Sequence, residues 1–190
     1  MEYRAIKHGL IHVYTGNGKG KTTTALGMAL RAIGHKKKVY FIQLLKGGAY
    51  TGEIIASKNI SKLNITQFGE PCYYLKEMEA MDCRECMECF DTKKDGIHVN
   101  RGMKAARKAL KSGKYDMVIL DEINNALHKH YLTVKEVINL LKKKSEQTEV
   151  VLTGRHAPKE IIKIADLVTE MKEIKHPYNE GIKARAGIEY

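Results

Sequence analysis

A glycine-rich segment between an apolar run and a helical pattern constrains the fold of this chain more than any other feature. The segment, residues 14–24, reads Y-T-G-N-G-K-G-K-T-T-T. Residues 10–14 are strand-like, and apolar residues recur at helical spacing from Ala25 until Gly34. Such a loop turns backbone N–H groups toward anions, and the positive end of the following helix dipole adds to the attraction. The sequence therefore predicts a loop that binds the phosphates of a nucleoside triphosphate.

Two side chains in this loop have predicted chemical roles. Lys21 can reach the terminal phosphates, and the Thr22 hydroxyl is placed to bind Mg²⁺. The loop departs from the usual pattern because Thr15 stands where the first glycine is expected. Glycine clusters alone are mostly turns, so the prediction rests on the strand before the loop and the helix after it.

A second apolar run ends in two carboxylates. Residues 117–122 read M-V-I-L-D-E. In phosphate-loop proteins we expect a strand of this kind to lie beside the first strand and to bring an acid to the magnesium. The same pattern also occurs at solvated strand ends, and it is the upstream loop that favours the metal-binding interpretation of Asp121 and Glu122, since Mg²⁺ prefers oxygen ligands.

Strand-like runs alternate with helical patterns along the chain. We expect strands at residues 10–14, 39–45, 63–68, 115–120, 150–153 and 167–171, and helices at residues 25–34, 97–111, 133–143 and 158–165. This alternation predicts an α/β fold, a mostly parallel sheet with helices on both faces. The 190 residues, 43% of them hydrophobic, fit one compact domain over residues 1–190.

The net charge of +11 would by itself suggest a nucleic-acid partner. Two lysine runs, residues 36–38 and 142–144, each follow a predicted helix, where cations complement the helix dipole. No basic stripe is interleaved with aromatic residues, as in proteins that bind single strands. We therefore expect no nucleic-acid partner.

No segment of the sequence approaches the roughly 20 apolar residues that span a membrane. The first eight residues, M-E-Y-R-A-I-K-H, are not followed by a long apolar stretch. We therefore expect a cytoplasmic protein with no membrane partner, whose cysteines are reduced.

Four segments together carry a resemblance to a known family. They are T-G-N-G-K-G-K-T-T at residues 15–23, V-I-L-D-E-I-N at residues 118–124, L-T-G-R at residues 152–155 and K-H-P-Y-N-E-G-I-K-A-R-A-G-I-E-Y at residues 175–190. Over nearly the whole chain, the sequence resembles the ATP:corrinoid adenosyltransferases of the phosphate-loop type. The last segment is the most specific, because generic phosphate-loop ATPases do not share it.

The resemblance implies a RecA-like phosphate-loop fold and a homodimer. It implies transfer of the 5′-deoxyadenosyl group of ATP to the cobalt(I) of a reduced corrinoid, with release of inorganic triphosphate. A reductase, by family expectation a flavoprotein, supplies the cobalt(I). The family also lacks the first glycine of the loop and binds ATP in the reverse sense along it, so Thr15 agrees with the resemblance. The choice between cobalamin and cobinamide or an earlier precursor stays open.

On this resemblance Lys21 and Glu122 are the predicted catalytic residues, and Mg²⁺ is expected at Thr22, Glu122 and Asp121. Arg155 matches a family position that contacts nucleotide or phosphate, and a plain surface arginine is the alternative. The predicted contacts to ATP are Gly16, Asn17, Gly18, Lys19, Gly20, Lys21, Thr22, Thr23 and Arg155.

The region after the third predicted strand departs from the family pattern. Family members present aromatic residues there that displace the lower axial ligand of the corrinoid. Phe68, Tyr73 and Tyr74 are the candidates to face the corrin ring, and packing in the core is the alternative.

All four cysteines lie in a local insert at residues 72–91. Cys83, Cys86 and Cys89 would lie along one side of a helix, and with Cys72 they form a candidate four-thiolate site for zinc or an iron–sulfur cluster. The alternative is a set of reduced, partly buried thiols in an acid-rich insert.

Two other functional classes remain as alternatives. A RecA-like ATPase would use Glu122 to activate water and would release phosphate. A nucleic-acid-binding module would lose affinity steeply with salt, and ATP would matter little.

Overall fold

Six parallel strands form one sheet in the order β3-β2-β4-β5-β1-β6. The computed structural model describes residues 7–47, 51–70 and 95–190. The strands are β1 (Ile11–Thr15), β2 (Val39–Leu44), β3 (Leu63–Phe68), β4 (Met117–Asp121), β5 (Glu149–Thr153) and β6 (Leu167–Glu170). The helices are α1 (Lys21–Gly34), α2 (Gly52–Ser57), α3 (Asp95–Ser112), α4 (Ile123–His128), α5 (Val134–Leu141), α6 (Lys159–Ile164) and the 3₁₀ helix η1 (Pro177–Glu180).

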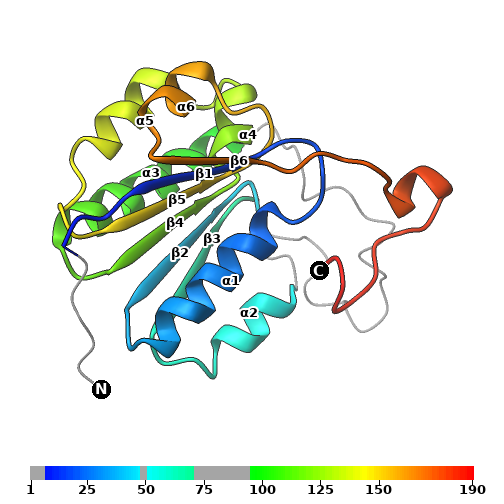
Figure 1. Ribbon diagram of the computed structural model, residues 1–190, viewed down its shortest axis with the longest axis horizontal. Coiled ribbons are helices and arrows are strands. Elements are labelled where there is room, and N and C mark those ends of the chain that lie inside the picture. The colour runs from blue at the N-terminus through cyan, green and yellow to red at the C-terminus, as the bar shows by residue number, and fades with distance from the viewer. Residues whose placement is uncertain (1–6, 48–50, 71–94) are drawn as a thin grey trace.

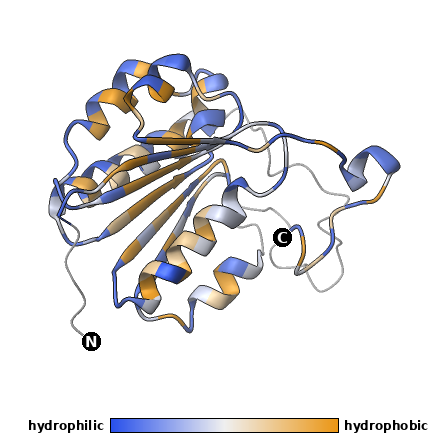
Figure 2. Cartoon of the chain, viewed as in Figure 1, coloured by the Kyte–Doolittle hydropathy of each residue, from blue (hydrophilic) through white to orange (hydrophobic). Residues whose placement is uncertain are grey.

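Helices cover both faces of the sheet (Figure 1). On β2 and β4, successive side chains alternate between two apolar clusters, so Phe41 and Ile119 face α1 while Ile42 and Leu120 face the α3 side. The strands are coloured largely as hydrophobic in Figure 2, which agrees with the burial of the central strands between the two helical layers. The predicted α/β class, with a parallel sheet between two helical layers, is confirmed.

All six expected strands are present, and the four expected helices are α1, α3, α5 and α6. The short helices α2, α4 and η1 were not expected, because the sequence around each of them shows no clear helical period. Helix α5 has the strongest local start signal, a capping box in which Thr133 and Glu136 satisfy each other's backbone N–H groups.

One expectation about the sheet was wrong. The strand that ends in two carboxylates, β4, does not lie beside β1, because β5 is hydrogen-bonded between them. Apolar strands buried on both faces look alike in sequence, so their composition did not reveal their lateral order.

Several predictions concern residues outside the described ranges. Cys72, Cys83, Cys86, Cys89, Tyr73 and Tyr74 all lie there, so the thiolate site and these two aromatic candidates stay predictions. Across the described ranges, none of the helices has the length and apolar character needed to cross a bilayer.

The parallel strands all end at the same edge of the sheet, which brings distant segments together. The loop after β1, the residues after β4 and the residues after β5 meet there. The C-terminal segment, residues 172–190, leaves β6 and returns toward the same edge (Figure 1).

Candidate active site

The glycines of the loop after β1 are required by its backbone shape and by its packing. Gly16 and Gly20 have φ values of 95° and 114°, in the left-handed region that favours glycine. The Gly18 N–H donates to the carbonyl of Met171 over 2.7 Å. A Cβ on Gly18 would lie 2.8 Å from that oxygen, so the loop and the exit of β6 are in direct backbone contact.

Lys21 lies inside the curve of this loop. Its Nζ donates to the carbonyl oxygens of Gly16 and Gly18 over 2.8 and 2.7 Å. Burial and the nearby Arg155 lower the pKa of Lys21, while the carboxylates that follow β4 act in the opposite direction. The ammonium group is therefore held at the centre of the loop, facing the acids of β4.

Asp121 is fully buried, and three side chains contact its carboxylate. Thr22 and Thr153 donate their hydroxyls to Oδ1 over 2.9 and 2.6 Å. Lys46 donates to Oδ2 over 2.8 Å. Both oxygens of Asp121 are thus satisfied by protein groups, and the Thr22 hydroxyl is fixed at the end of the loop.

Lys46 and Thr153 were not identified in the sequence as site residues. Burial lowers the pKa of Lys46, but Asp121 and then Glu122 outweigh it, and the net pKa is raised. The available signal was positional, because each of these residues lies at or just beyond the carboxyl end of a strand, β2 or β5.

Glu122 differs sharply from its neighbour Asp121. Its backbone is left-handed, with φ of 63°, and its N–H donates to the Thr153 hydroxyl over 3.0 Å. Its side-chain Oε2 is buried and has no hydrogen-bond partner within the described part of the chain. Burial and the Asp121 charge raise the pKa of Glu122, against the opposing effect of Lys46.

This unpartnered oxygen fits a divalent cation. A buried carboxylate oxygen needs a partner, and Mg²⁺ typically binds one or two carboxylates together with substrate phosphates. Glu122 and Thr22 line the same cavity of about 600 Å³, here called the Thr22 cavity. Lys46, Thr23 and Tyr190 also line it.

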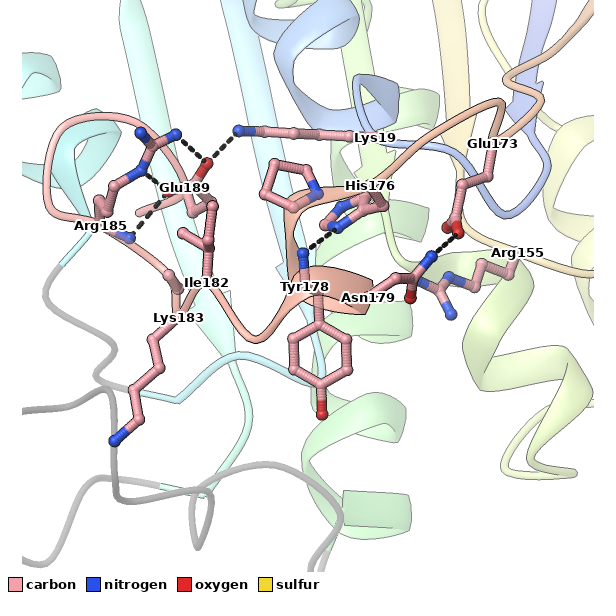
Figure 3. A pocket seen from close by; sticks show the side chains of 12 residues that line it. Lys19, Arg155, Glu173, His176, Tyr178, Asn179, Ile182, Lys183, Arg185 and Glu189 are labelled. Atoms are coloured by element: carbon pink, nitrogen blue, oxygen red, sulfur yellow. Dashed lines mark hydrogen bonds and ion pairs between the residues drawn. The ribbon is translucent and has the colours of Figure 1, made fainter.

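A second cavity of about 540 Å³, here called the Arg155 cavity, shares Glu189 of its lining with the Thr22 cavity. Figure 3 shows it between the loop, which carries Lys19, and the C-terminal segment, which carries Tyr178 and Arg185. Arg155 is positioned by its backbone N–H, which donates to Asn125 Oδ1 over 2.6 Å. Each cavity is lined by cations, Lys46 in the Thr22 cavity and Lys19 with Arg155 in the Arg155 cavity.

The structure brings most predicted site residues to this edge of the sheet. Lys21, Thr22, Asp121 and Glu122 are close together, whereas Lys19 and Arg155 line the Arg155 cavity. Asn17 and Thr23 are exposed on the loop and at the start of α1.

Phe68 occupies a different position. Its half-buried ring packs on the main apolar cluster, where a Cβ on Gly102 of α3 would lie 3.2 Å from it. This packing accounts for the aromatic residue at the end of β3, and its role toward a corrin ring stays a prediction.

The parallel sheet and the glycine-rich loop after β1 define a phosphate-loop fold of the RecA-like class. The sequence matches the family model "ATP:corrinoid adenosyltransferase BtuR/CobO/CobP" over residues 7–190. The chain therefore belongs to this family of adenosyl-transferring enzymes.

Individual relatives agree with the family match. A corrinoid adenosyltransferase from Sinorhizobium sp. is 39% identical over 191 residues, covering 100% of this chain and 84% of the relative. The corrinoid adenosyltransferase of Escherichia coli K12 is 34% identical over 190 residues, covering 97% of this chain and 87% of the relative.

A solved structure supports the fold alone. The flagellar accessory protein FlaH from Methanocaldococcus jannaschii superposes with a TM-score of 0.55 at 15% identity, covering 87% of this chain and 72% of that chain.

Proposed function

We propose that this protein transfers the 5′-deoxyadenosyl group of ATP to the cobalt(I) of a reduced corrinoid and releases inorganic triphosphate. The observation that carries the proposal is the family match over residues 7–190. A RecA-like ATPase is less well supported, because the relatives that match over nearly the whole chain are corrinoid adenosyltransferases.

The chemistry of this transfer sets what the protein must do. Cobalt(I) provides the electron pair of the new Co–C5′ bond, and the C5′–O bond to the α-phosphate breaks with its electron pair leaving on triphosphate. No proton transfer is required at the reacting atoms. The protein must therefore align the 5′ carbon with the cobalt and stabilise the departing anion.

We assign the stabilisation of triphosphate to the loop of residues 16–22 and to the cations around it. The Lys21 ammonium group already lies in the loop, where it donates to two backbone carbonyls. Phosphate oxygens can replace these carbonyls as its hydrogen-bond acceptors. Lys19 and Arg155 extend the positive charge into the Arg155 cavity. Three cations around one loop suit a chain of phosphates rather than a single one.

We propose that Glu122 and Thr22 hold Mg²⁺, which would neutralise charge on the phosphate oxygens. The support is the unpartnered Oε2 of Glu122 beside Thr22. Asp121 then has a different task, because its oxygens are taken by Thr22, Thr153 and Lys46 and it orients the Thr22 hydroxyl.

Several parts of the proposal come from the family expectation. They are a single catalytic domain over residues 1–190, a homodimer, a cytoplasmic location and a flavoprotein reductase that supplies cobalt(I). Light scattering tests the dimer, and metal analysis of the purified protein tests the predicted cysteine site.

The deciding experiment is an anaerobic assay with chemically reduced cobalamin and MgATP. We expect loss of the cobalt(I) absorption band together with formation of adenosylcobalamin and intact triphosphate. Lys21→Ala should abolish the reaction, while Lys175→Ala, at an exposed lysine outside both cavities, should not. Release of phosphate from ATP without cobalt alkylation would replace this proposal with the ATPase. Running the assay with cobinamide as well compares the two acceptors.

A further inference from the structure

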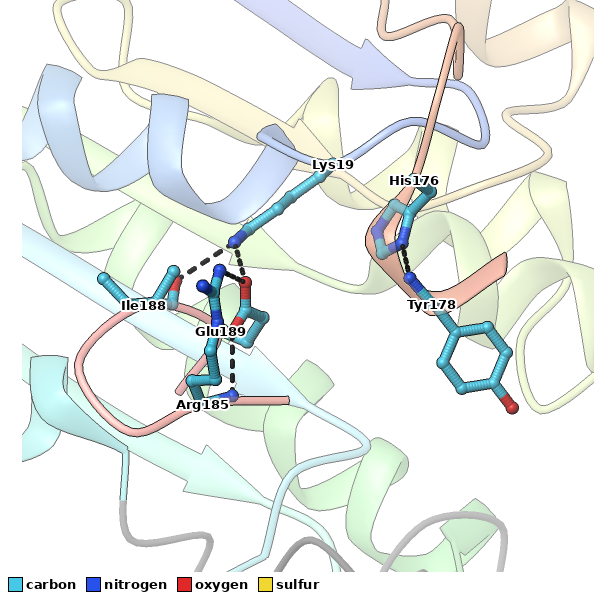
Figure 4. A network of polar contacts seen from close by, with 6 residues as sticks. All are labelled: Lys19, His176, Tyr178, Arg185, Ile188 and Glu189. Carbon is cyan, nitrogen blue, oxygen red and sulfur yellow. Dashed lines mark hydrogen bonds and ion pairs between the residues drawn. The ribbon is translucent and has the colours of Figure 1, made fainter. Parts of the chain in front are cut away.

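The C-terminal segment places a carboxylate on a lysine of the phosphate loop. Lys19 Nζ donates to Glu189 Oε1 over 2.8 Å and to the carbonyl oxygen of Ile188 over 3.2 Å (Figure 4). Lys19 is also one of the cations to which we assign the phosphates of ATP. One ammonium group therefore has two possible anionic partners, the Glu189 carboxylate and a phosphate.

The position of Glu189 does not depend on Lys19. The Arg185 backbone N–H donates to Glu189 Oε2 over 2.8 Å, and its guanidinium contacts both carboxylate oxygens at 3.2 Å. The Glu189 N–H donates in return to the Arg185 carbonyl over 2.9 Å. The carboxylate is thus held by its own turn, residues 185–189.

Glu189 is ionised at neutral pH, whereas Lys19 is the mobile member of the pair. Arg185 first, and then Lys19, lower the pKa of Glu189 to about 2. The Lys19 side chain is 44% exposed and the Glu189 side chain 21%. Lys19 can therefore turn toward a phosphate while Glu189 stays in place on Arg185.

We propose that Glu189 competes with triphosphate for Lys19 and so promotes release of the triphosphate product. This inference rests on the proposed function, which makes triphosphate the leaving group. A site that stabilises a departing polyanion also retains it afterwards, and product release often limits turnover. A fixed carboxylate gives Lys19 a partner as soon as triphosphate leaves, so the lysine returns to an ion pair instead of standing alone.

The expected size of the effect follows from the exposure of the pair. An exposed ion pair is worth a factor of about 2 to 5 in an equilibrium constant. Glu189 also repels a phosphate bound at Lys19, so its neutralisation removes a second unfavourable contribution. We expect Glu189→Gln to bind triphosphate on the order of 3- to 10-fold more tightly than the wild-type protein.

The test measures binding of inorganic tripolyphosphate with Mg²⁺ by isothermal titration calorimetry, which needs no corrinoid and no turnover. The matched control is Glu180→Gln, which removes the same charge from the same segment. Glu180 pairs with Lys175 over 2.8 Å, and neither lines the Arg155 cavity. We expect E180Q to bind as the wild-type protein does, and circular dichroism verifies that both variants are folded.

A second pair of variants separates competition at Lys19 from a general change in charge. In a Lys19→Ala background, Glu189→Gln should raise triphosphate affinity by less than it does in the wild-type background, because only the direct repulsion between Glu189 and phosphate is then removed. In the transferase assay E189Q should show a normal first turnover, then a lower steady-state rate and stronger inhibition by added triphosphate. A loss of packing alone would not produce this pattern.

The outcomes are distinguishable. Equal or weaker triphosphate binding by E189Q, or an equal gain in the Lys19→Ala background, would overturn the inference alone. A wild-type protein that does not bind triphosphate would also overturn the inference alone, whereas phosphate release from ATP without cobalt alkylation would overturn the proposed function, and the inference with it.

Discussion

Two consecutive residues, Asp121 and Glu122, have opposite relations to the fold. Asp121 accepts contacts from Thr22, Thr153 and Lys46 and is fully satisfied. Glu122 buries an oxygen without a partner in the described structure, and its pKa is raised by burial and by Asp121. The first carboxylate stabilises the site, while the second keeps a buried oxygen without a hydrogen-bond partner until a ligand binds.

Neutralising each acid should therefore change stability in opposite directions. A raised pKa in the folded state means that the contribution of Glu122 is favourable below its unfolded pKa and is lost as pH rises through the folded value. Glu122→Gln avoids this loss and should unfold at higher urea concentration than wild type at pH 8, without metal or nucleotide.

Asp121→Asn removes the charged partner of buried Lys46 and should lower the free energy of unfolding by about 3 kcal/mol. Urea titrations from pH 5 to pH 8 measure both, and shifts of the same sign would contradict this account.

Among the elements, the contact between the loop and the exit of β6 should control phosphate binding. Gly18 has no room for a Cβ beside Met171, so Gly18→Ala must displace the loop. We expect a large loss of MgATP affinity in this variant, measured by calorimetry. Gly27, in α1, has open space at the same position, and Gly27→Ala should stabilise the protein by up to about 1 kcal/mol and keep its affinity. Equal affinities in the two variants would show that the β6 contact does not shape the loop.

The elements themselves were largely readable in the sequence. Runs such as Val39–Leu44 and Met117–Asp121 are apolar because they are buried on both faces, and that burial is what composition records. The order of the strands across the sheet could not be predicted from the sequence. It depends on which connections join adjacent strands and which pass over one or more strands, and composition does not record this. Short helices such as α4 were missed because tertiary contacts, rather than a helical period, hold them in place.

At the scale of the whole molecule, the two edges of the sheet are divided between function and stability. At the edge opposite the site, Glu149 of β5 contacts His12 of β1 and accepts the Leu10 N–H over 2.9 Å. Burial raises the pKa of Glu149, but the hydrogen bonds from His12 and Leu10 outweigh it, and the net pKa is lowered.

A lowered folded pKa stabilises the protein above the unfolded pKa, near 4.5, and this contribution is lost as pH falls through the folded value. Glu149→Gln should thus lower the free energy of unfolding by about 1 to 2 kcal/mol at neutral pH. The stability of this variant should also fall less than that of the wild-type protein as the pH is lowered. Its transferase turnover should match wild type below the melting temperature, because the site lies at the other edge. Urea unfolding between pH 3 and pH 7, with the cobalt assay alongside, provides the check, and a fall in turnover would count against the division.

The site was only partly predictable from the sequence for a physical reason. Lys21, Thr22, Asp121 and Glu122 fall in local motifs, in which neighbours along the chain create the chemistry. Lys46 and the pairing of Lys19 with Glu189 arise only when distant segments meet. Charge alone does not identify such partners, since 33 lysine and arginine residues were available.

Strand β5, which lies between β1 and β4, also sets the distance between these two strands. Two strand spacings, about 9.6 Å, separate the strand that ends in the phosphate loop from the strand that ends in the carboxylates. Backbone hydrogen bonding, and no side chain, sets this width. Mutation can therefore change the charge or shape of the side chains that follow β1 and β4, but the distance between the ends of these two strands is fixed by the peptide repeat itself.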